Sequence, residues 1–274
     1  MIEIRALRGI AISILGLLTW AAGDAAAAAF TVTPVRILLG RGASSSLLTV
    51  RNDSTEPIRF QITLKAWNQA PDGNMELSDT NDLVFFPTLM EVKPSEQKNV
   101  RIGSSFKAPV TTERSYRIFF EELPPPQVAA KPDEKQTGAQ VKVLTKMGVP
   151  IFIQPASPVI KGEIGGLSQS GRNVDFDVKN VGNSFFTVMG TSVTGIAKDG
   201  STTFEKKQDG WYVLAGGLRH FRFEVPAEKC AATDHIRVDI TSTLSDEKGN
   251  PAPFQQEMPI NAAACAAAPA PAHK

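Results

Sequence analysis

The sequence predicts an all-β protein made of two immunoglobulin-like β-sandwich domains joined by a short hinge. Three observations predict this fold class. Apolar and polar residues alternate with a period of two, turn-forming residues separate the alternating segments, and no segment shows a sustained helical period. Seven such segments fall within about 125 residues, which is the strand spacing of an immunoglobulin-like sandwich, and a second series follows.

The first 29 residues have the pattern of a secretory signal peptide. Arg5 and Arg8 form a basic start, residues 9–20 are apolar, and the alanine run at 25–29 offers cleavage sites. The apolar stretch of about a dozen residues is shorter than the roughly 20 that a membrane-spanning helix needs. We therefore expect export and cleavage near Ala29. An uncleaved membrane anchor is the alternative.

The first domain is expected over residues 30–154. Its seven candidate strands cover residues 30–39, 46–52, 58–67, 84–92, 99–102, 115–123 and 139–153. Between the second and third, the segment NDSTEP has the asparagine, aspartate and proline content of a turn.

The last candidate strand of this domain is unusually long. Residues 138–153 would span about 50 Å at roughly 3.3 Å per residue, several times what a small sandwich needs. Ala139, Val141 and Val143 alternate with Gln140 and Lys142, so one face of the strand is apolar. An edge strand with an apolar face can pair with another chain. The alternative is that these side chains only pack the core of their own domain.

A hinge is expected at residues 154–158, QPASP, because two prolines in five residues fix the backbone and remove hydrogen-bond donors. The second domain is expected over residues 155–262, and residues 263–274, rich in alanine and proline, are expected to form a flexible tail. The candidate strands of the second domain cover residues 159–164, 173–179, 185–194, 210–214, 219–225, 235–241 and 254–260.

Cys230 and Cys265 are the two cysteines of the chain. In an oxidising compartment they could form a disulfide across a loop of about 35 residues, worth roughly 3 to 4.7 kcal/mol in a chain-entropy model. Two free thiols are the alternative. A metal site is not expected, because His220, His235 and His273 do not lie at ligand spacing.

Charge and motifs argue against two function classes. The formal net charge is +1, whereas nucleic-acid-binding proteins usually carry a strongly basic balance or patch. The histidines match no catalytic motif, and neither G-x-S-x-G nor H-E-x-x-H occurs. The Asp-x-Asp at 175–177 is ordinary strand alternation. We therefore expect no enzymatic activity, cofactor or small-molecule substrate.

Five motifs occur in collinear order and together span nearly the whole chain after residue 29. They are VTPVRILL (32–39), LTVRNDSTEPIRFQITLKAWNQ (48–69), LVFFPTLMEVKPSEQKNVRIG (83–103), SYRIFFEELPPP (115–126) and DVKNVGNSFFTVMG (177–190). They resemble the periplasmic chaperones of the chaperone–usher pathway, which assemble fimbriae on Gram-negative bacteria. The resemblance implies that the two domains sit at an angle and that the protein works in the periplasm.

The resemblance also implies the partners. Pilus subunits resemble a sandwich that lacks its last strand, and such chaperones lend them a strand from the first domain. They then deliver the subunit to the outer-membrane usher. Ala139, Val141 and Val143 match the face of the strand that is lent.

In this family two basic residues hold the C-terminal carboxylate of the subunit. Arg36 falls on the family's arginine position, and an arginine fork can hold a carboxylate through two bonds. An ungapped match puts Gly148 where many members have lysine. Lys146 lies two residues earlier, on the same face of a strand, and is the candidate for the second basic residue.

The resemblance further places Glu113 and Asp246 near positions of a charged network that holds the two domains together, and the arginine completing it is replaced here by Gln154 or a neighbour. The rival function is an exported two-domain adhesin or structural pilus component. Against it, a subunit should be a single domain with a donor extension. Here the long strand lies in the middle of a two-domain chain.

Overall fold

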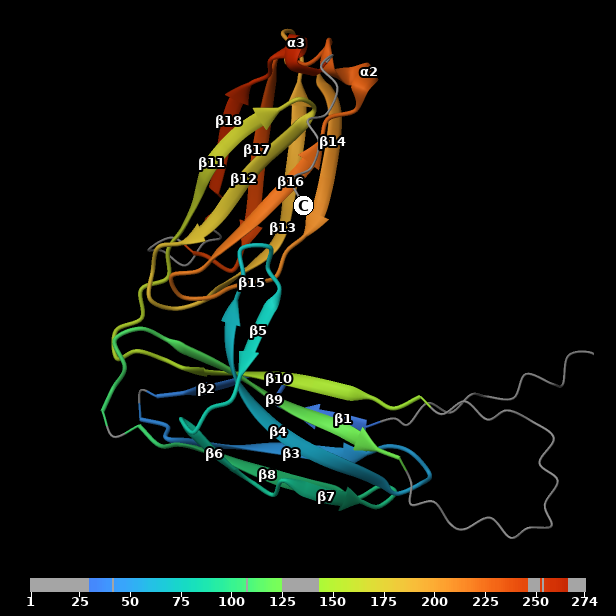
Figure 1. Ribbon diagram of the computed structural model, residues 1–274, viewed down its shortest axis with the longest axis vertical. Coiled ribbons are helices and arrows are strands. Elements are labelled where there is room, and N and C mark those ends of the chain that lie inside the picture. Colours follow the sequence, from blue (N-terminus) through green and yellow to red (C-terminus); the bar gives the residue numbers. More distant parts are fainter. Residues whose placement is uncertain are drawn as a thin grey trace, which may run out of the picture.

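The computed structural model describes residues 30–40, 42–106, 108–124, 143–245, 252 and 254–265. Nearly all of the regular structure in these ranges is β-sheet. Figure 1 shows two sandwiches whose strands run in different directions, the first built from β1–β10 and the second from β11–β18. The predicted fold class is confirmed. In the described ranges, neither short helix is long and apolar enough to cross a membrane.

The first sandwich packs a four-stranded sheet, in the order β1-β3-β8-β6, against a six-stranded sheet, in the order β2-β10-β9-β4-β5 with β7 paired to β4. The strands are β1 (Phe30–Thr33), β2 (Ile37–Leu39), β3 (Ser45–Asn52), β4 (Ile58–Gln69), β5 (Met75–Ser78), β6 (Leu83–Phe86), β7 (Leu89–Val92), β8 (Gln97–Ser104), β9 (Arg114–Leu123) and β10 (Lys146–Ile153).

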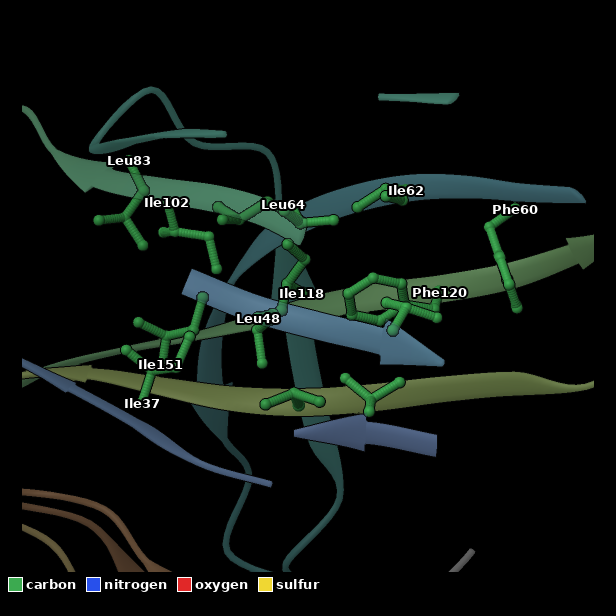
Figure 2. Packing of buried hydrophobic residues seen from close by; sticks show 14 of the residues in the cluster. Ile37, Leu48, Phe60, Ile62, Leu64, Leu83, Ile102, Ile118, Phe120 and Ile151 are labelled. Atoms are coloured by element: carbon green, nitrogen blue, oxygen red, sulfur yellow. The ribbon is translucent and has the colours of Figure 1, made fainter. Parts of the chain in front are cut away.

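Side chains from both sheets meet in the core of this sandwich (Figure 2). Leu48 and Ile102 come from the four-stranded sheet, and Ile118 and Ile151 from the six-stranded sheet; all four are fully buried. Each such side chain contributes about 1.5 to 3 kcal/mol on burial. Because successive side chains of a strand point to opposite faces, residues 147, 149, 151 and 153 of β10 face the core. Residues 146, 148, 150 and 152 therefore lie on the outer face.

Two predicted strands are each divided by a proline. Residues 30–39 form β1 in one sheet and β2 in the other, with Pro34 between them, and residues 84–92 are divided at Pro87 into β6 and β7 in the same way. A proline has no N–H to continue a ladder of hydrogen bonds, so the chain leaves one sheet at these points and joins the other.

The prediction of one strand over residues 138–153 is wrong in part. β10 begins at Lys146, residues 143–145 are not in a strand, and residues 138–142 lie outside the described ranges. The backbone hydrogen bonds between β9 and the segment before β10 end with the bond from the Glu122 N–H to the Thr145 carbonyl (2.9 Å). β9 ends at Leu123, and the three prolines that follow it have no N–H to extend the pairing.

The second sandwich has a three-stranded sheet, β11-β12-β16, and a five-stranded sheet, β14-β13-β17-β18 with β15 paired to β13. The strands are β11 (Gly162–Ser170), β12 (Asn173–Asn180), β13 (Phe186–Ile196), β14 (Thr202–Asp209), β15 (Tyr212–Val213), β16 (Leu218–Glu224), β17 (His235–Ser242) and β18 (Phe254–Pro259).

Two short helices, α2 (Ala227–Cys230) and α3 (Ala262–Cys265), lie at the end of the second sandwich far from the first (Figure 1). A disulfide between Cys230 and Cys265 joins them, with Cα atoms 6.3 Å apart. The first three residues of the predicted tail, 263–265, are therefore helical. Residues 266–274 lie outside the described ranges.

Candidate functional site

The N-terminal part of β10, residues 146–150, has one open edge. On one side β10 pairs with β9 along its whole length, from Lys146 to Ile153. On the other side β2 pairs in parallel with residues 151–153 alone, and no other described strand covers residues 146–150. An open edge of this kind exposes backbone donors and acceptors that can pair with an added strand. The edge stops where β2 begins.

Arg36 stands at the end of this edge. It directly precedes β2, and because Ile37 and Leu39 face the core, Arg36 lies on the outer face of the six-stranded sheet. Its side chain is exposed, with the guanidinium carbon 5.5 Å from the ring centre of Phe185 in the second domain. Within the described part of the chain, Arg36 forms no ion pair.

Lys146 lies on the same face but at a distance from Arg36. The register places Ile37 beside Ile151, which brings Arg36 level with Pro150. Lys146 is four residues before Pro150, or about 13 Å along the strand at roughly 3.3 Å per residue. Its ammonium pairs with the Glu121 carboxylate at 2.8 Å and is half exposed. The structure thus does not bring the two predicted anchor residues together.

Arg117, on β9, is a basic residue of this face that the sequence analysis missed. Pro150 pairs with Arg117, so Arg36, Pro150 and Arg117 form a row across three adjacent strands. The guanidinium carbon of Arg117 lies 4.6 Å from the ring centre of Trp67 and 5.6 Å from that of Trp211. The alternation along this strand could have indicated it. Tyr116 and Ile118 on either side face the core, so Arg117 lies on the outer face.

Arg117 is only 7% exposed, and its Nε atom is buried without a hydrogen-bond partner. Burial lowers its pKa, because an apolar surrounding disfavours the charged form. The Nη atoms are not among the buried unpaired atoms.

Aromatic side chains from both domains fill the space beside these arginines. Trp67 and Phe152 of the first domain are buried, and Phe185 and Tyr212 of the second pack against them. Phe152 stacks on Phe185 with ring centres 4.0 Å apart, and Trp67 meets Tyr212 edge to face at 5.5 Å. Each such aromatic pair is worth about 0.5 to 1.5 kcal/mol beyond the area it buries. This aromatic cluster fixes the outer face of the sheet against the second domain.

Glu113 lies at the same junction of the domains. Its Oε1 accepts a hydrogen bond from the Phe185 N–H (3.0 Å), and its Oε2 is buried with no partner among the described residues. Burial raises the pKa of Glu113 to about 7, although the Phe185 bond and the charge of Arg36 act in the opposite direction. Asp246, its expected companion in a charged network, lies outside the described ranges, and Gln154 donates its N–H to the Leu39 carbonyl.

The predicted donor residues are described only in part. Val143 is 73% exposed and Leu144 is 44% exposed. Val143 has the parity of the core-facing residues of β10, but it lies before the strand and covers no part of its own core. Ala139 and Val141 lie outside the described ranges.

The described residues therefore form an all-β protein of two sandwiches, with an open strand edge that ends beside basic residues at the domain junction. Residues 29–158 match the family model described as pili and flagellar-assembly chaperone, PapD N-terminal domain. Residues 29–158 therefore carry the N-terminal domain of this family, which confirms the resemblance indicated by the sequence motifs.

Solved chaperone structures share the fold at low sequence identity. The chain is similar to the structure of the CsuC–CsuE chaperone–tip adhesion subunit complex from Acinetobacter baumannii, with 16% identity, a TM-score of 0.55, and coverage of 84% of this chain and 98% of that chain. The class 5 fimbriae chaperone CfaA has 16% sequence identity and a TM-score of 0.53, with coverage of 84% of this chain and 98% of that chain. The YadV chaperone has 11% sequence identity and a TM-score of 0.54, with coverage of 84% of this chain and 99% of that chain. In a comparison with curated protein sequences, nothing matches the chain at a significant level.

Proposed function

We propose that this protein is a periplasmic chaperone that binds pilus subunits by donor-strand complementation and delivers them to the outer-membrane usher. The observation that carries the proposal is the open edge of β10, which ends beside Arg36 in a domain of the pilus-chaperone family. The similar CsuC structure is a complex of a chaperone with a tip adhesion subunit, which supports subunits as the partner class.

The open edge supplies the affinity in this proposal. A subunit that lacks its last strand exposes a groove in its core, and such a groove is prone to aggregation. The 139–143 segment offers Ala139, Val141 and Val143 to that groove. Burial of each valine contributes about 1.5 to 3 kcal/mol, and each ladder hydrogen bond about 0.5 to 1.5 kcal/mol net.

Arg36 is the proposed anchor for the C-terminal carboxylate of the subunit. Its position at the end of the open edge supports this role, because an added strand must stop where β2 covers β10. The charge-assisted bonds of an arginine fork to a carboxylate are worth about 1.5 to 3 kcal/mol. Sequence matching alone selects Lys146 as the second basic residue, but its ammonium already pairs with the Glu121 carboxylate. Glu113 with Asp246 is proposed to help set the domain angle.

Co-expression in the periplasm of a bacterial host tests the proposal. The chain is produced with a candidate pilus subunit from the same genome, and soluble subunit that co-purifies is measured. Arg36→Ala, Val141→Asp and Val143→Asp are each expected to reduce this yield at least tenfold, while circular dichroism shows a folded chaperone. Val181→Asp, an exposed valine of the second domain, is the control and should leave the yield unchanged. Wild-type yields with all three site variants would overturn the assignment.

A further inference from the structure

We infer that Arg117, and not Lys146, is the second cation that holds the client carboxylate together with Arg36. This inference rests on the proposed function, because it concerns how the same site binds its client. It assigns a role to a residue that sequence matching did not select.

The first argument is position. Arg36, Pro150 and Arg117 occupy one row across β2, β10 and β9, on the outer face of the sheet. Strands lie about 4.8 Å apart, so the backbones of the two arginines are about 10 Å apart, which leaves room for one carboxylate between the two forks. Lys146 lies about 13 Å further along β10.

The second argument is the space over β10. A Cβ atom added at Gly148 would lie 2.8 Å from the Phe119 ring and 3.6 Å from Nη1 of Arg117. The absence of a side chain at Gly148 therefore makes room for the Phe119 ring, and Nη1 of Arg117 lies beside Gly148 on β10, next to the open edge. The ammonium of Lys146 also lies over this face, 5.3 Å from the ring centre of Phe119, but it pairs with the Glu121 carboxylate.

The third argument is the balance of charge. Lys146 pairs with Glu121, and Lys65, directly opposite Arg117 on β4, pairs with Asp79. Neither Arg36 nor Arg117 has a carboxylate within ion-pair distance in the described ranges. A guanidinium as buried as that of Arg117 is costly to keep charged without a partner. A carboxylate that arrives with the client would offset this cost.

The fourth argument is the end of the edge. An added strand that pairs with residues 146–150 cannot continue past Ile151, because β2 occupies that position. The end of the added strand therefore lies beside Arg36 and Arg117. Two cations without an ion-pair partner among the described residues favour a carboxyl terminus over an amino terminus at this point, so the added strand should run parallel to β10.

The test uses a peptide of the last ten residues of the subunit that co-purifies, made once with a free C-terminal carboxylate and once as the amide. The chaperone is exported to the periplasm of the host and purified from there. Trp67 and Trp211 both flank Arg117, so tryptophan fluorescence reports binding at this place. Affinities are measured for the wild type, Arg117→Met, Arg117→Lys, Arg36→Met and Lys146→Met.

We expect Arg117→Met and Arg36→Met each to weaken binding of the free-carboxylate peptide by about 10- to 100-fold, since charge-assisted hydrogen bonds of about 1.5 to 3 kcal/mol are lost. Binding of the amide peptide should change less than about threefold. Arg117→Lys should restore part of the loss, and Lys146→Met should behave like the wild type.

Three outcomes would overturn the inference. Arg117→Met could bind the free-carboxylate peptide like the wild type, it could lose both peptides equally as a structural defect would, or Lys146→Met could show the larger loss. These outcomes differ from failure of the proposed function itself, in which the wild-type chain would retain no subunit in the co-expression experiment.

Discussion

Glu113 shows how one side chain makes the contact between the two domains dependent on pH. It belongs to the first domain, is buried, and accepts a hydrogen bond from the Phe185 N–H of the second domain. Desolvation holds its pKa near 7, well above the ordinary value of 4.5. The folded chain therefore keeps a proton on Glu113 at pH values where the unfolded chain has released it.

The sign of the resulting pH dependence follows from this shift. The stabilisation linked to Glu113 is full below pH 4.5 and is lost as the pH rises through about 7. The free energy of unfolding should fall across this window, by up to about 1.4 kcal/mol per pH unit. Glu113→Gln keeps an oxygen acceptor for the Phe185 N–H and should remove this part of the slope.

Urea denaturation between pH 4.5 and 8 measures this effect. Glu163→Gln changes an exposed carboxylate of β11 and is the control, which should keep the wild-type slope. An unchanged slope in Glu113→Gln would show that Glu113 does not titrate in this range.

At the scale of elements, each domain has a turn where the chain passes from one sheet to the other, and a buried asparagine side chain holds both turns. Asn52 ends β3, and its amide nitrogen donates to the Glu56 and Val92 carbonyls. Asn180 ends β12, and its amide nitrogen donates to the Ser184 and Val213 carbonyls. In both, the side-chain oxygen accepts the N–H two residues later. A buried amide thus satisfies the backbone groups that the turn leaves without a sheet partner.

Asn180→Ala should lower the free energy of unfolding by about 2 to 4 kcal/mol, because two buried carbonyls and one N–H lose their partner. Asn99→Ala is the matched control. Asn99 is exposed and holds one bond from the Thr49 hydroxyl, so its loss should cost less than about 1 kcal/mol. Thermal and urea unfolding of the two variants measure the difference. Equal losses would mean that the turn is held by other contacts.

At the scale of the whole molecule, aromatic packing and a hairpin connect the two domains. Beside the aromatic cluster, the hairpin of β4 and β5 reaches the second domain (Figure 1). The Gln69 side chain donates to the Tyr212 carbonyl at 2.8 Å, and the His220 N–H donates to the Pro71 carbonyl at 2.7 Å. These contacts position the second domain beside the face that carries Arg36 and Arg117.

Phe185→Ala should loosen this connection while both domains stay folded. The change removes the stack on Phe152 and the ring beneath Arg36. Each lost aromatic contact is worth about 0.5 to 1.5 kcal/mol. Calorimetry should then resolve two separate unfolding transitions, one for each domain, which overlap more in the wild type. Small-angle X-ray scattering should show a broader distribution of distances between the two domains.

Phe254→Ala is the control for this change, because Phe254 packs on Phe186 inside the second domain. It should lower the stability of that domain and leave the scattering profile unchanged. Identical scattering of Phe185→Ala and the wild type would show that the hairpin alone fixes the domain angle.

The fold class was predictable because apolar and polar residues alternate along each strand according to the face on which they lie. Ile118 and Phe120 alternate with Arg117 and Phe119, and the period of two is visible without a structure. The missed strands, β5 and β14, have largely exposed side chains, so little alternation marks them. They exist because β4 and β13 offer edges with which they pair.

The candidate site was predictable to a smaller extent. The motif match selected Arg36, which the structure places at the end of the open edge. It also selected Lys146, because a residue two positions before Gly148 lies on the same face of the strand. A motif match along one strand does not identify residues that lie on the neighbouring strand. Arg117 lies 33 residues before Pro150 in the sequence, and only the register of β9 with β10 brings them side by side.

The sequence by itself determined the all-β class, the motifs of a pilus-assembly chaperone and the position of Arg36, because these depend on local alternation and on the order of residues. Only the tertiary structure decided where β10 begins, that its edge is open as far as β2, and which cations share its outer face. These features depend on pairing between distant segments and on burial, and neither is encoded in any one stretch of the chain.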